Sequence, residues 1–430
     1  MKGKTSPCGC HIPKGGLARR ASFGDSIRRE YSQVLVVDGG NFFPENDDPH
    51  YGDDAVFLMD AMKLLGTDAV GIGEHELRYG FSFLKVNATR IGTPVVCANL
   101  LMKASGKPAF APYLIRQVGS VKVGIFGLMS DKVAYGPSAD SLTVEEPTAT
   151  ARRVLAEMKK KGATVTVLLS QLGKVESEDL AASVDGIDAL IIGHASTLLM
   201  KGRVIKNTVA CYGGEQAQYM GRTILTLDAA HRQTAGECDV YMMGPEVVNE
   251  PGMLKLVKSF EDGFNEKMRK IDQETAAKRE AAKGDDNPDR FLGAELCVRC
   301  HESEGEQWKT TAHALAWQTL VDAKKDATPE CVTCHVVGYR KPGGFAALDD
   351  AARLGNVQCE NCHGMGTMHD SFPATRPVVR EEVCADCHQG EHDPEWNWEK
   401  KRAMIVHSNM TGESVRSLQH NMGRMNHGGQ

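Results

Sequence analysis

The sequence predicts an α/β domain at its N-terminal end, followed by a mostly helical or irregular segment. Short apolar runs alternate with helical patterns up to about residue 245, which is typical of a layered domain with a mostly buried sheet. The alternation fades from Phe291 onward, where aliphatic runs are too sparse to build much of a protein core. The 13 cysteines mark the same division, because eight of them lie beyond Phe291.

The strands of the first domain are expected at eight short runs rich in Val and Ile, many of which end in Gly or Asp. These runs are residues 34–38, 68–73, 94–98, 121–128, 164–170, 189–193, 208–212 and 223–228. Helical patterns such as residues 54–65 and 148–161 lie between them. The order of the elements therefore supports the α/β assignment.

A long helix is expected next, over residues 252–283. Its apolar residues recur at helical spacing and are Leu254, Val257, Phe260, Phe264, Met268 and Ile271. Lys, Glu and Ala follow, so the helix should pack at its start, continue as a solvated connector and end at Gly284 and Pro288. Beyond it, only residues 313–321 show a helical pattern. The expected divisions are a domain over 1–245, a helical connector over 246–290, a cofactor-binding domain over 291–410 and a polar tail over 411–430.

Composition and charge exclude some classes of function. The chain is 41% hydrophobic and 25% charged, which is ordinary for a globular protein. Its net charge is −6 and it has no long basic run, which argues against nucleic acid as a partner. Residues 291–430 alone carry 14 Lys and Arg against 19 Asp and Glu, a net charge of −5. The chain has no apolar run of about eighteen residues, so no membrane span is expected.

Four Cys-x-x-Cys-His motifs occupy the last third of the chain. They are Cys297-Val-Arg-Cys300-His301, Cys331-Val-Thr-Cys334-His335, Cys359-Glu-Asn-Cys362-His363 and Cys384-Ala-Asp-Cys387-His388. Two thiols at this spacing reach the two vinyl groups of one haem, and the next histidine ligates its iron. Zinc ribbons also use Cys-x-x-Cys pairs but have no need of the histidine, which all four motifs contain. The motifs therefore predict four covalent haem c groups.

The second axial position of each iron is not settled by spacing alone. The segment offers several further histidines and methionines as ligands. They are His313, His369, His392, His407, His420, His427, Met365, Met368 and Met404.

The sequences around the motifs are distinctive as well, namely those around His313, residues 330–339 and 343–345, and Val357-Gln-Cys-Glu-Asn-Cys-His-Gly-Met-Gly-Thr-Met-His369. In these sequences, residues 291–408 resemble the tetrahaem cytochrome family that carries electrons from hydroxylamine oxidoreductase. The resemblance implies that His313, His369 and His407 are distal ligands and that one haem lacks a distal protein ligand. His392 is then expected to be solvated.

The first 245 residues contain a second set of recognisable segments, which are residues 15–21, 37–41, 73–76, 79–80, 123–128, 169–173 and 192–196. In these segments the chain resembles the calcineurin-like metallophosphoesterase domain of periplasmic 5'-nucleotidases. The resemblance implies the fold of that family, a layered sandwich. It also implies a two-metal site of carboxylate, imidazole and amide ligands.

Most of that metal site is missing here. Asn41 stands where the family has its bridging Asp, and Glu74 replaces an Asn. Gln171 and Ser196 each replace a His, so His75 and His194 are the two family histidines that remain. Two-metal hydrolysis needs ligands for both ions. We therefore expect a scaffold that has lost phosphoesterase activity, with no catalytic residue.

The N-terminus has no apolar stretch of the kind found in secretory signals, although haem is attached to c-type cytochromes after export. The first-strand Asp-x-His of the phosphoesterase family is absent too. Both observations lead us to expect a start codon assigned too late and a periplasmic or extracellular protein. The role of Cys8 and Cys10 stays open, and the five cysteines outside the motifs form no tidy disulfide framework.

The sequence as a whole predicts an electron carrier with four haems and a non-hydrolytic domain for docking or assembly. Redox proteins are its expected partners, and its oligomeric state is open. One alternative is an enzyme that acts on a small nitrogen compound at a five-coordinate haem. Another is an active phosphoesterase fused to an electron carrier, which the ligand losses oppose.

Overall fold

The computed structural model describes residues 5–6, 13–45, 51–194, 197–214, 216–281, 290–367, 379–390, 392–393 and 395–407. The chain divides into two compact units, Met1–Lys258 and Ser259–Gln430. Among the described residues, no helix is both long and apolar enough to cross a membrane.

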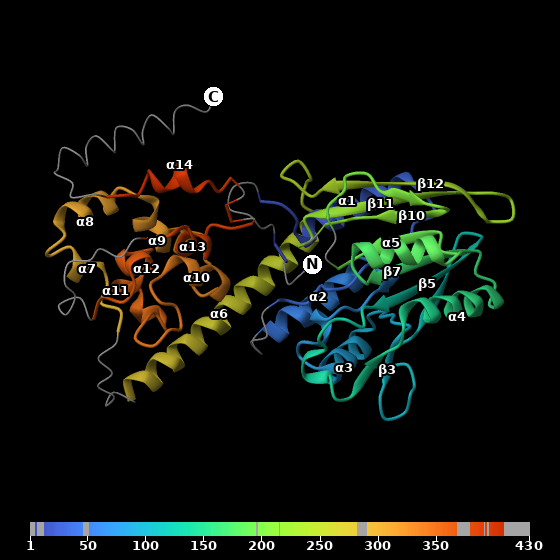
Figure 1. Cartoon of the computed structure of the whole chain (residues 1–430), viewed down its shortest axis with the longest axis horizontal. Helices are drawn as coiled ribbons and strands as arrows, with labels where there is room; N and C mark the ends of the chain where they lie inside the picture. The colour runs from blue at the N-terminus through green and yellow to red at the C-terminus, as the bar shows by residue number, and fades with distance from the viewer. Residues whose placement is uncertain are drawn as a thin grey trace. The chain divides into compact units, whose positions relative to one another are not determined.

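A six-stranded sheet forms the centre of the first unit (Figure 1). Its order is β4 (Tyr113–Val118), β5 (Val121–Met129), β7 (Val165–Gln171), β8 (Ala189–Ile192), β10 (Thr208–Cys211) and β9 (Arg203–Ile205). The four inner strands are parallel, whereas β4 and β9 run antiparallel at the two edges. The carboxyl ends of β7 and β8 therefore lie at one edge of the sheet, where loops can build a site.

Both faces of this sheet are buried. Leu168 of β7 belongs to a core cluster with α4 (Pro147–Lys160) and α5 (Lys174–Ser183). Its neighbours Val167 and Leu169 belong to a second cluster on the opposite face, as the alternation of side chains along a strand requires. The predicted layered α/β fold with a mostly buried sheet is confirmed.

Among the described residues, three strand pairs, three more α-helices and the short 3-10 helices η2 (His75–Leu77) and η3 (Gly136–Ser138) complete the unit. The pairs are β1 (Val37–Asp38) with β2 (Ala69–Val70), β3 (Leu100–Met102) with β6 (Leu142–Val144), and β11 (Tyr219–Leu227) with β12 (Gln233–Met242). The helices are α1 (Leu17–Glu30), α2 (Gly52–Leu64) and α3 (Phe81–Ile91). Seven of the eight runs predicted as strands contain one, while residues 94–98 form only isolated bridges through Val95 and Val96.

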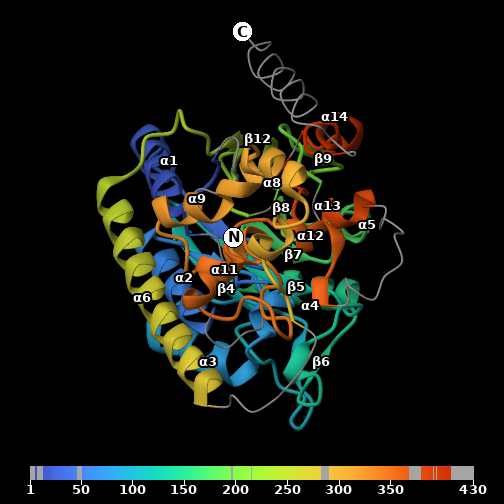
Figure 2. The same cartoon turned by 90° about the vertical axis from the view of Figure 1, so that its left-hand side faces the viewer.

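The long helix α6 (Pro251–Ala281) confirms the helix predicted for this stretch (Figure 2). From Ser259 onward the helix belongs to the second unit, and its predicted apolar positions extend to Ile271. Met268 is buried, Arg269 pairs with Asp326 at 2.7 Å, and the Asn265 side chain donates to the carbonyl of Lys324 at 3.1 Å. The apolar spacing that continues past the start of the helix explains these later contacts.

The second unit is helical and has a small core, as predicted. Its elements are α7 (Ala294–Cys297), α8 (Glu302–Lys309), η4 (Ala312–Leu315), α9 (Ala316–Asp322), α10 (Pro329–His335), η5 (Leu348–Asp350), α11 (Ala351–Leu354), α12 (Cys359–His363), α13 (Glu381–Ala385) and α14 (Trp398–Arg402). The buried hydrophobic cluster consists of Phe291, Leu320, Val332, Val336, Val337, Phe345 and Leu354. Among the described residues of this unit, the short helices surround this one small cluster.

Candidate functional site

Each Cys-x-x-Cys-His motif begins in a short helix. The first motif starts at the end of α7, the second lies in α10, the third forms α12, and the fourth starts within α13. Residues three apart in a helix lie on the same side, so the two thiols of the second and of the third motif, which lie within α10 and α12, point in a common direction. All eight motif thiols are free, and Cys300 is the exposed one.

The motifs approach one another in pairs. The thiol of Cys297 shares a hydrogen bond with that of Cys359, and this bond lowers the pKa of Cys297 to about 7. Cys334 has the same relation to Cys387, and its pKa is also lowered to about 7. The first motif therefore lies beside the third, and the second beside the fourth.

Two of the expected distal histidines face motif histidines. The ring centres of His313 and His388 are 6.0 Å apart, and those of His407 and His363 are 5.9 Å apart. An imidazole nitrogen lies about 2 Å from the metal that it binds and its ring centre about 1 Å further out, so two imidazoles on opposite sides of one ion have centres about 6 Å apart. Both pairs therefore have the spacing that a shared metal ion requires.

Burial favours the neutral form of three of these imidazoles, those of His313, His363 and His407. Burial, followed by the neighbouring His388, lowers the pKa of His313. Burial also lowers the pKa of His363 and of His407, each with a smaller contribution from nearby histidines. A neutral imidazole is the form that binds a metal, so the surroundings suit ligation.

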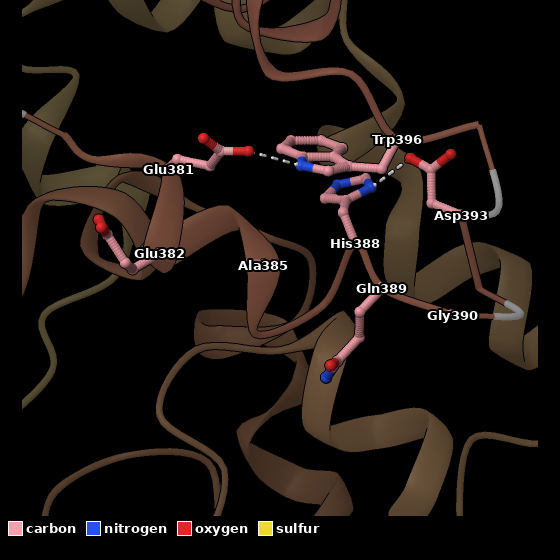
Figure 3. Close-up of a pocket in the computed structure, with 8 residues that line it drawn as sticks. All are labelled: Glu381, Glu382, Ala385, His388, Gln389, Gly390, Asp393 and Trp396. Carbon is pink, nitrogen blue, oxygen red and sulfur yellow. Dashed lines mark hydrogen bonds and ion pairs between the residues drawn. The ribbon is translucent and has the colours of Figure 1, made fainter.

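A carboxylate orients the histidine of the fourth motif (Figure 3). Asp393 accepts one hydrogen bond from His388 Nδ1 at 2.9 Å and another from Lys401 Nζ at 2.7 Å. The Trp396 ring stacks on His388 with centres 4.8 Å apart, and its indole N–H donates to Glu381 at 3.2 Å. With Nδ1 engaged, Nε2 is left for a metal.

This carboxylate borders a cavity of about 580 Å³, which His388, Asp393 and Trp396 help to line. The sequence reasoning did not identify Asp393. The available signal was a carboxylate five positions after the motif histidine.

The other candidate ligands have different surroundings. His335 Nδ1 lies 2.5 Å from the carbonyl oxygen of Ala316, and in the described part of the chain no imidazole is in ring contact with His335. His407 Nδ1 lies 3.3 Å from Gln307 Oε1. His301 and His392 are exposed.

The methionines and the remaining histidines are less informative. Met365 packs against the hydrophobic cluster of the second unit, and Met404 is half-buried. His369, Met368, His420 and His427 lie outside the described residues, as do Cys8, Cys10 and Ser196.

The positions of the expected phosphoesterase site meet at the carboxyl ends of the strands. Asn41 follows β1, Glu74 follows β2 and His194 follows β8. The Asn41 amide nitrogen lies 2.9 Å from Glu74 Oε1 and 3.3 Å from His194 Nδ1. Glu74 Oε1 also lies 3.1 Å from His194 Nδ1 and 3.8 Å from His75 Nε2. The substituted residues therefore bond to one another.

The electrostatics of this cluster differ from those of a two-metal site. Burial opposes ionisation of Glu74, but hydrogen bonds with His194 and Asn41 outweigh it and lower its pKa to about 2. Gln171 donates to the carbonyl of Gly39 at 2.7 Å, which ties its amide to the backbone. Among the described residues, no group of three or more His, Cys, Asp or Glu side chains could hold a metal ion. The cluster is a hydrogen-bonded network with one ionised carboxylate.

Glu76 fixes the loop that carries this network. Its buried carboxylate accepts the backbone N–H groups of Asn41, Phe42, Phe43 and Gly73 at 2.7 to 3.1 Å. Burial outweighs these bonds and raises its pKa to about 7. A Cβ at Gly73 would lie 1.9 Å from the Asn41 side-chain oxygen, so this approach requires glycine. The scaffold of the site is thus intact although its ligands have changed.

Comparison with known proteins separates the two parts of the chain. Residues 296–364 match the family model of cytochrome c554 and c-prime. This part is 36% identical over 91 residues to cytochrome c-554 of Nitrosomonas europaea, an alignment that covers 18% of this chain and 39% of that protein. The likeness implies covalently attached haem c in the C-terminal part.

The N-terminal part is similar to nucleotidases. It is 30% identical over 210 residues to the 2',3'-cyclic-nucleotide 2'-phosphodiesterase/3'-nucleotidase of Yersinia enterocolitica, covering 42% of this chain and 32% of that enzyme. Its fold matches the 5'-nucleotidase precursor of Thermus thermophilus with a TM-score of 0.54 and 23% identity, over 60% of this chain and 56% of that one. The chain therefore spans less than two thirds of each of these proteins. It joins a fold of the 5'-nucleotidase type to a region similar to cytochrome c554.

Proposed function

We propose that this protein is an exported electron carrier that holds four covalent haems through its four motifs. The observation that carries the proposal is that two pairs of imidazoles face each other at the spacing of two axial ligands. These pairs are His313 with His388 and His407 with His363. Bound haem would supply reversible one-electron exchange at its iron. In each of these two pairs one histidine comes from a motif and the other from a distant segment.

The residues around the motifs have distinct duties in this proposal. The eight motif thiols attach the cofactors, and His301, His335, His363 and His388 ligate the irons. His313 is the distal ligand for the fourth motif, His407 for the third, and His369 is assigned to one of the other two. Asp393 keeps the His388 ring in one tautomer and orientation. The pairing of motifs through Cys297–Cys359 and Cys334–Cys387 favours short gaps between neighbouring cofactors.

The N-terminal unit serves for docking or assembly in this proposal and does not hydrolyse nucleotides. The bonds among Asn41, Glu74 and His194 support this role, because they occupy positions that would otherwise ligate metal ions. Haem attachment after export places the protein in the periplasm or outside the cell. A net charge of −5 over residues 291–430 favours redox partners with a basic docking surface.

Haem counting by mass tests the proposal. Protein made in a host with haem-attachment machinery should gain four haem masses that survive denaturation. Replacing both cysteines of one motif with Ser should remove one haem mass, whereas Cys97→Ala, which alters a buried thiol outside the motifs, should remove none. A mass with two or fewer haems, or zinc in their place, would contradict the proposal.

A second candidate function is chemistry on a small nitrogen compound at an open iron. The surroundings of His335 in the second motif favour this candidate. Only three distal histidines are expected for four motifs, and two of them, His313 and His407, face the fourth and the third motif. An open iron binds carbon monoxide or nitric oxide. Binding at one haem that is lost when the second motif is removed would support this candidate, and four closed irons would exclude it.

A further inference from the structure

Two cysteines outside the haem motifs lie together in the first unit. Cys211 ends β10 in the main sheet, and Cys238 lies in β12 of the hairpin formed by β11 and β12. Both are buried, with 3% and 4% of their surface exposed. Neither belongs to the phosphoesterase-like cluster or to a haem motif.

The backbone brings the two sulfurs to one place. Pairing of β9 with β10 sets Arg203 opposite Ala210, and the amide of Gly202, just before β9, donates to the Cys238 carbonyl at 2.7 Å. A Cβ at Gly221 of β11 would lie 2.2 Å from Cys211 Sγ and 3.8 Å from Cys238 Sγ. Both sulfurs therefore lie over the same glycine, where the missing side chain leaves them room, and they share a hydrogen bond.

The surroundings suit a covalent bond better than a metal or a nucleophile. Val209 and Val240 join the two cysteines in a buried apolar cluster. Thr223 is the neighbouring polar side chain, and its hydroxyl bonds to both thiols. In the described part of the chain no third His, Cys, Asp or Glu completes a metal site with these two thiols, and such deep burial keeps a thiolate from reacting with a substrate.

We propose that Cys211 and Cys238 form a disulfide that ties the hairpin of β11 and β12 to the main sheet. The inference rests on the export in the proposed function, because disulfides persist in oxidising compartments. The two thiols give up two protons and two electrons as the S–S bond forms. A disulfide of a thiol–disulfide oxidoreductase takes them and becomes two thiols.

The bond should stabilise the first unit by restricting its unfolded chain. It closes a loop over residues 212–237, which connects two layers of the fold. A loop of this length corresponds to a rise in melting temperature of about 5–10 °C for a unit of this size. Burial of both sulfurs should also protect the bond from reductants.

The peptide map of the exported, full-length protein tests the inference. The protein is denatured with an alkylating agent but without reductant and then digested with trypsin. Residues 207–222 and 233–255 should appear as one linked species that reductant separates, while Cys97 carries the alkyl label. Alkyl groups on both Cys211 and Cys238 without reductant would overturn the inference.

Variants give a second readout. The melting temperature should fall by about the same amount in Cys211→Ala, in Cys238→Ala and in the double variant, because each removes the same bond. Losses that add in the double variant would mean that the thiols only pack. Cys97→Ala is the matched control and should keep the linked peptides.

Haem content of the same sample separates the two proposals. Free thiols in a haem-loaded protein would contradict the disulfide alone. Linked peptides in a protein without haem would contradict the electron-carrier proposal alone.

Discussion

At the scale of single residues, the histidines of the C-terminal part differ in what each ring faces. His313 and His407 each face a motif histidine, and burial lowers the pKa of both. His392 is exposed. Facing a second imidazole in a half-buried position is what distinguishes a candidate axial ligand from a solvated side chain.

Replacing His313 or His407 with Ala should open one iron in each variant. Loss of the distal imidazole leaves that iron five-coordinate, so its spectrum should change from low spin to high spin and it should bind carbon monoxide. Optical and electron paramagnetic resonance spectra measure the change. His392→Ala is the control and should leave the spectra unaltered. Low-spin spectra in both ligand variants would show that the facing rings do not share an iron.

Glu74 gives the first unit a pH dependence at low pH. Burial opposes its ionisation, but bonds with His194 and Asn41 lower its pKa from 4.5 to about 2. Because the pKa is lower in the folded state, the stabilisation is complete above about pH 4.5 and is lost as the pH falls toward 2. Glu74→Gln should therefore lower the free energy of unfolding by about 1–2 kcal/mol near pH 6, a value that allows for partial solvent exposure. Near pH 2 the decrease should be much smaller.

Urea titrations of wild type and variant from pH 6 to pH 2 measure this difference. Asp185→Asn, at a side chain that is 94% exposed, should change stability little at any pH. A cost for Glu74→Gln that stays constant down to pH 2 would show that the carboxylate is not responsible.

At the scale of elements, one carboxylate joins the segments around the first and third motifs. Glu360 of α12 accepts the backbone N–H groups of Leu292 and Gly293 just before α7, each at 2.9 Å, and that of Gly366 at 2.8 Å. The indole N–H of Trp308 in α8 donates to the Val357 carbonyl at 2.8 Å. Because the apolar core of the second unit is small, these polar contacts help to hold the first and third motifs in position.

Glu360→Gln should destabilise the second unit by about 2–3 kcal/mol, because an amide replaces one acceptor oxygen with a donor that faces buried N–H groups. The melting temperature and the yield of fully haem-loaded protein should both fall. Glu306→Gln, on the exposed side of α8, is the matched control. Equal losses in the two variants would mean that the backbone contacts of Glu360 are unimportant.

At the scale of the whole molecule, two units with different chemistry share one chain. The first has a fold of the 5'-nucleotidase type, and Glu76 fixes the loop of its candidate site through backbone contacts, but the cluster holds a neutral Asn41. The second carries the four motifs. Redox chemistry is the activity that we propose for the protein.

The exported, full-length protein should not hydrolyse nucleotides in the presence of manganese. A bridging carboxylate offsets the repulsion between two dications, and Asn41 cannot supply that charge. Turnover assays with several nucleotides, combined with metal analysis, test this expectation. Two bound metal ions and turnover that His75→Ala abolishes would show that the site is active after all.

The sequence alone was sufficient where the signal is local. The four motifs are read from spacing within five residues, and the inner parallel strands are read from continuous apolar runs because both of their faces are buried. The edge strand β4 and the hairpin strand β12 were not predicted. Their half-buried faces mix polar with apolar side chains, so neither shows a continuous apolar run.

Only the tertiary structure decided which distant residues meet. It set His313 against His388 and His407 against His363, placed Asp393 on the fourth motif and brought Cys211 to Cys238. Each of these contacts depends on the path of the loops and on strand register, which local spacing does not encode. The sequence therefore determined which chemical groups the protein possesses, whereas folding determined their partners, because a partner is chosen by proximity in space.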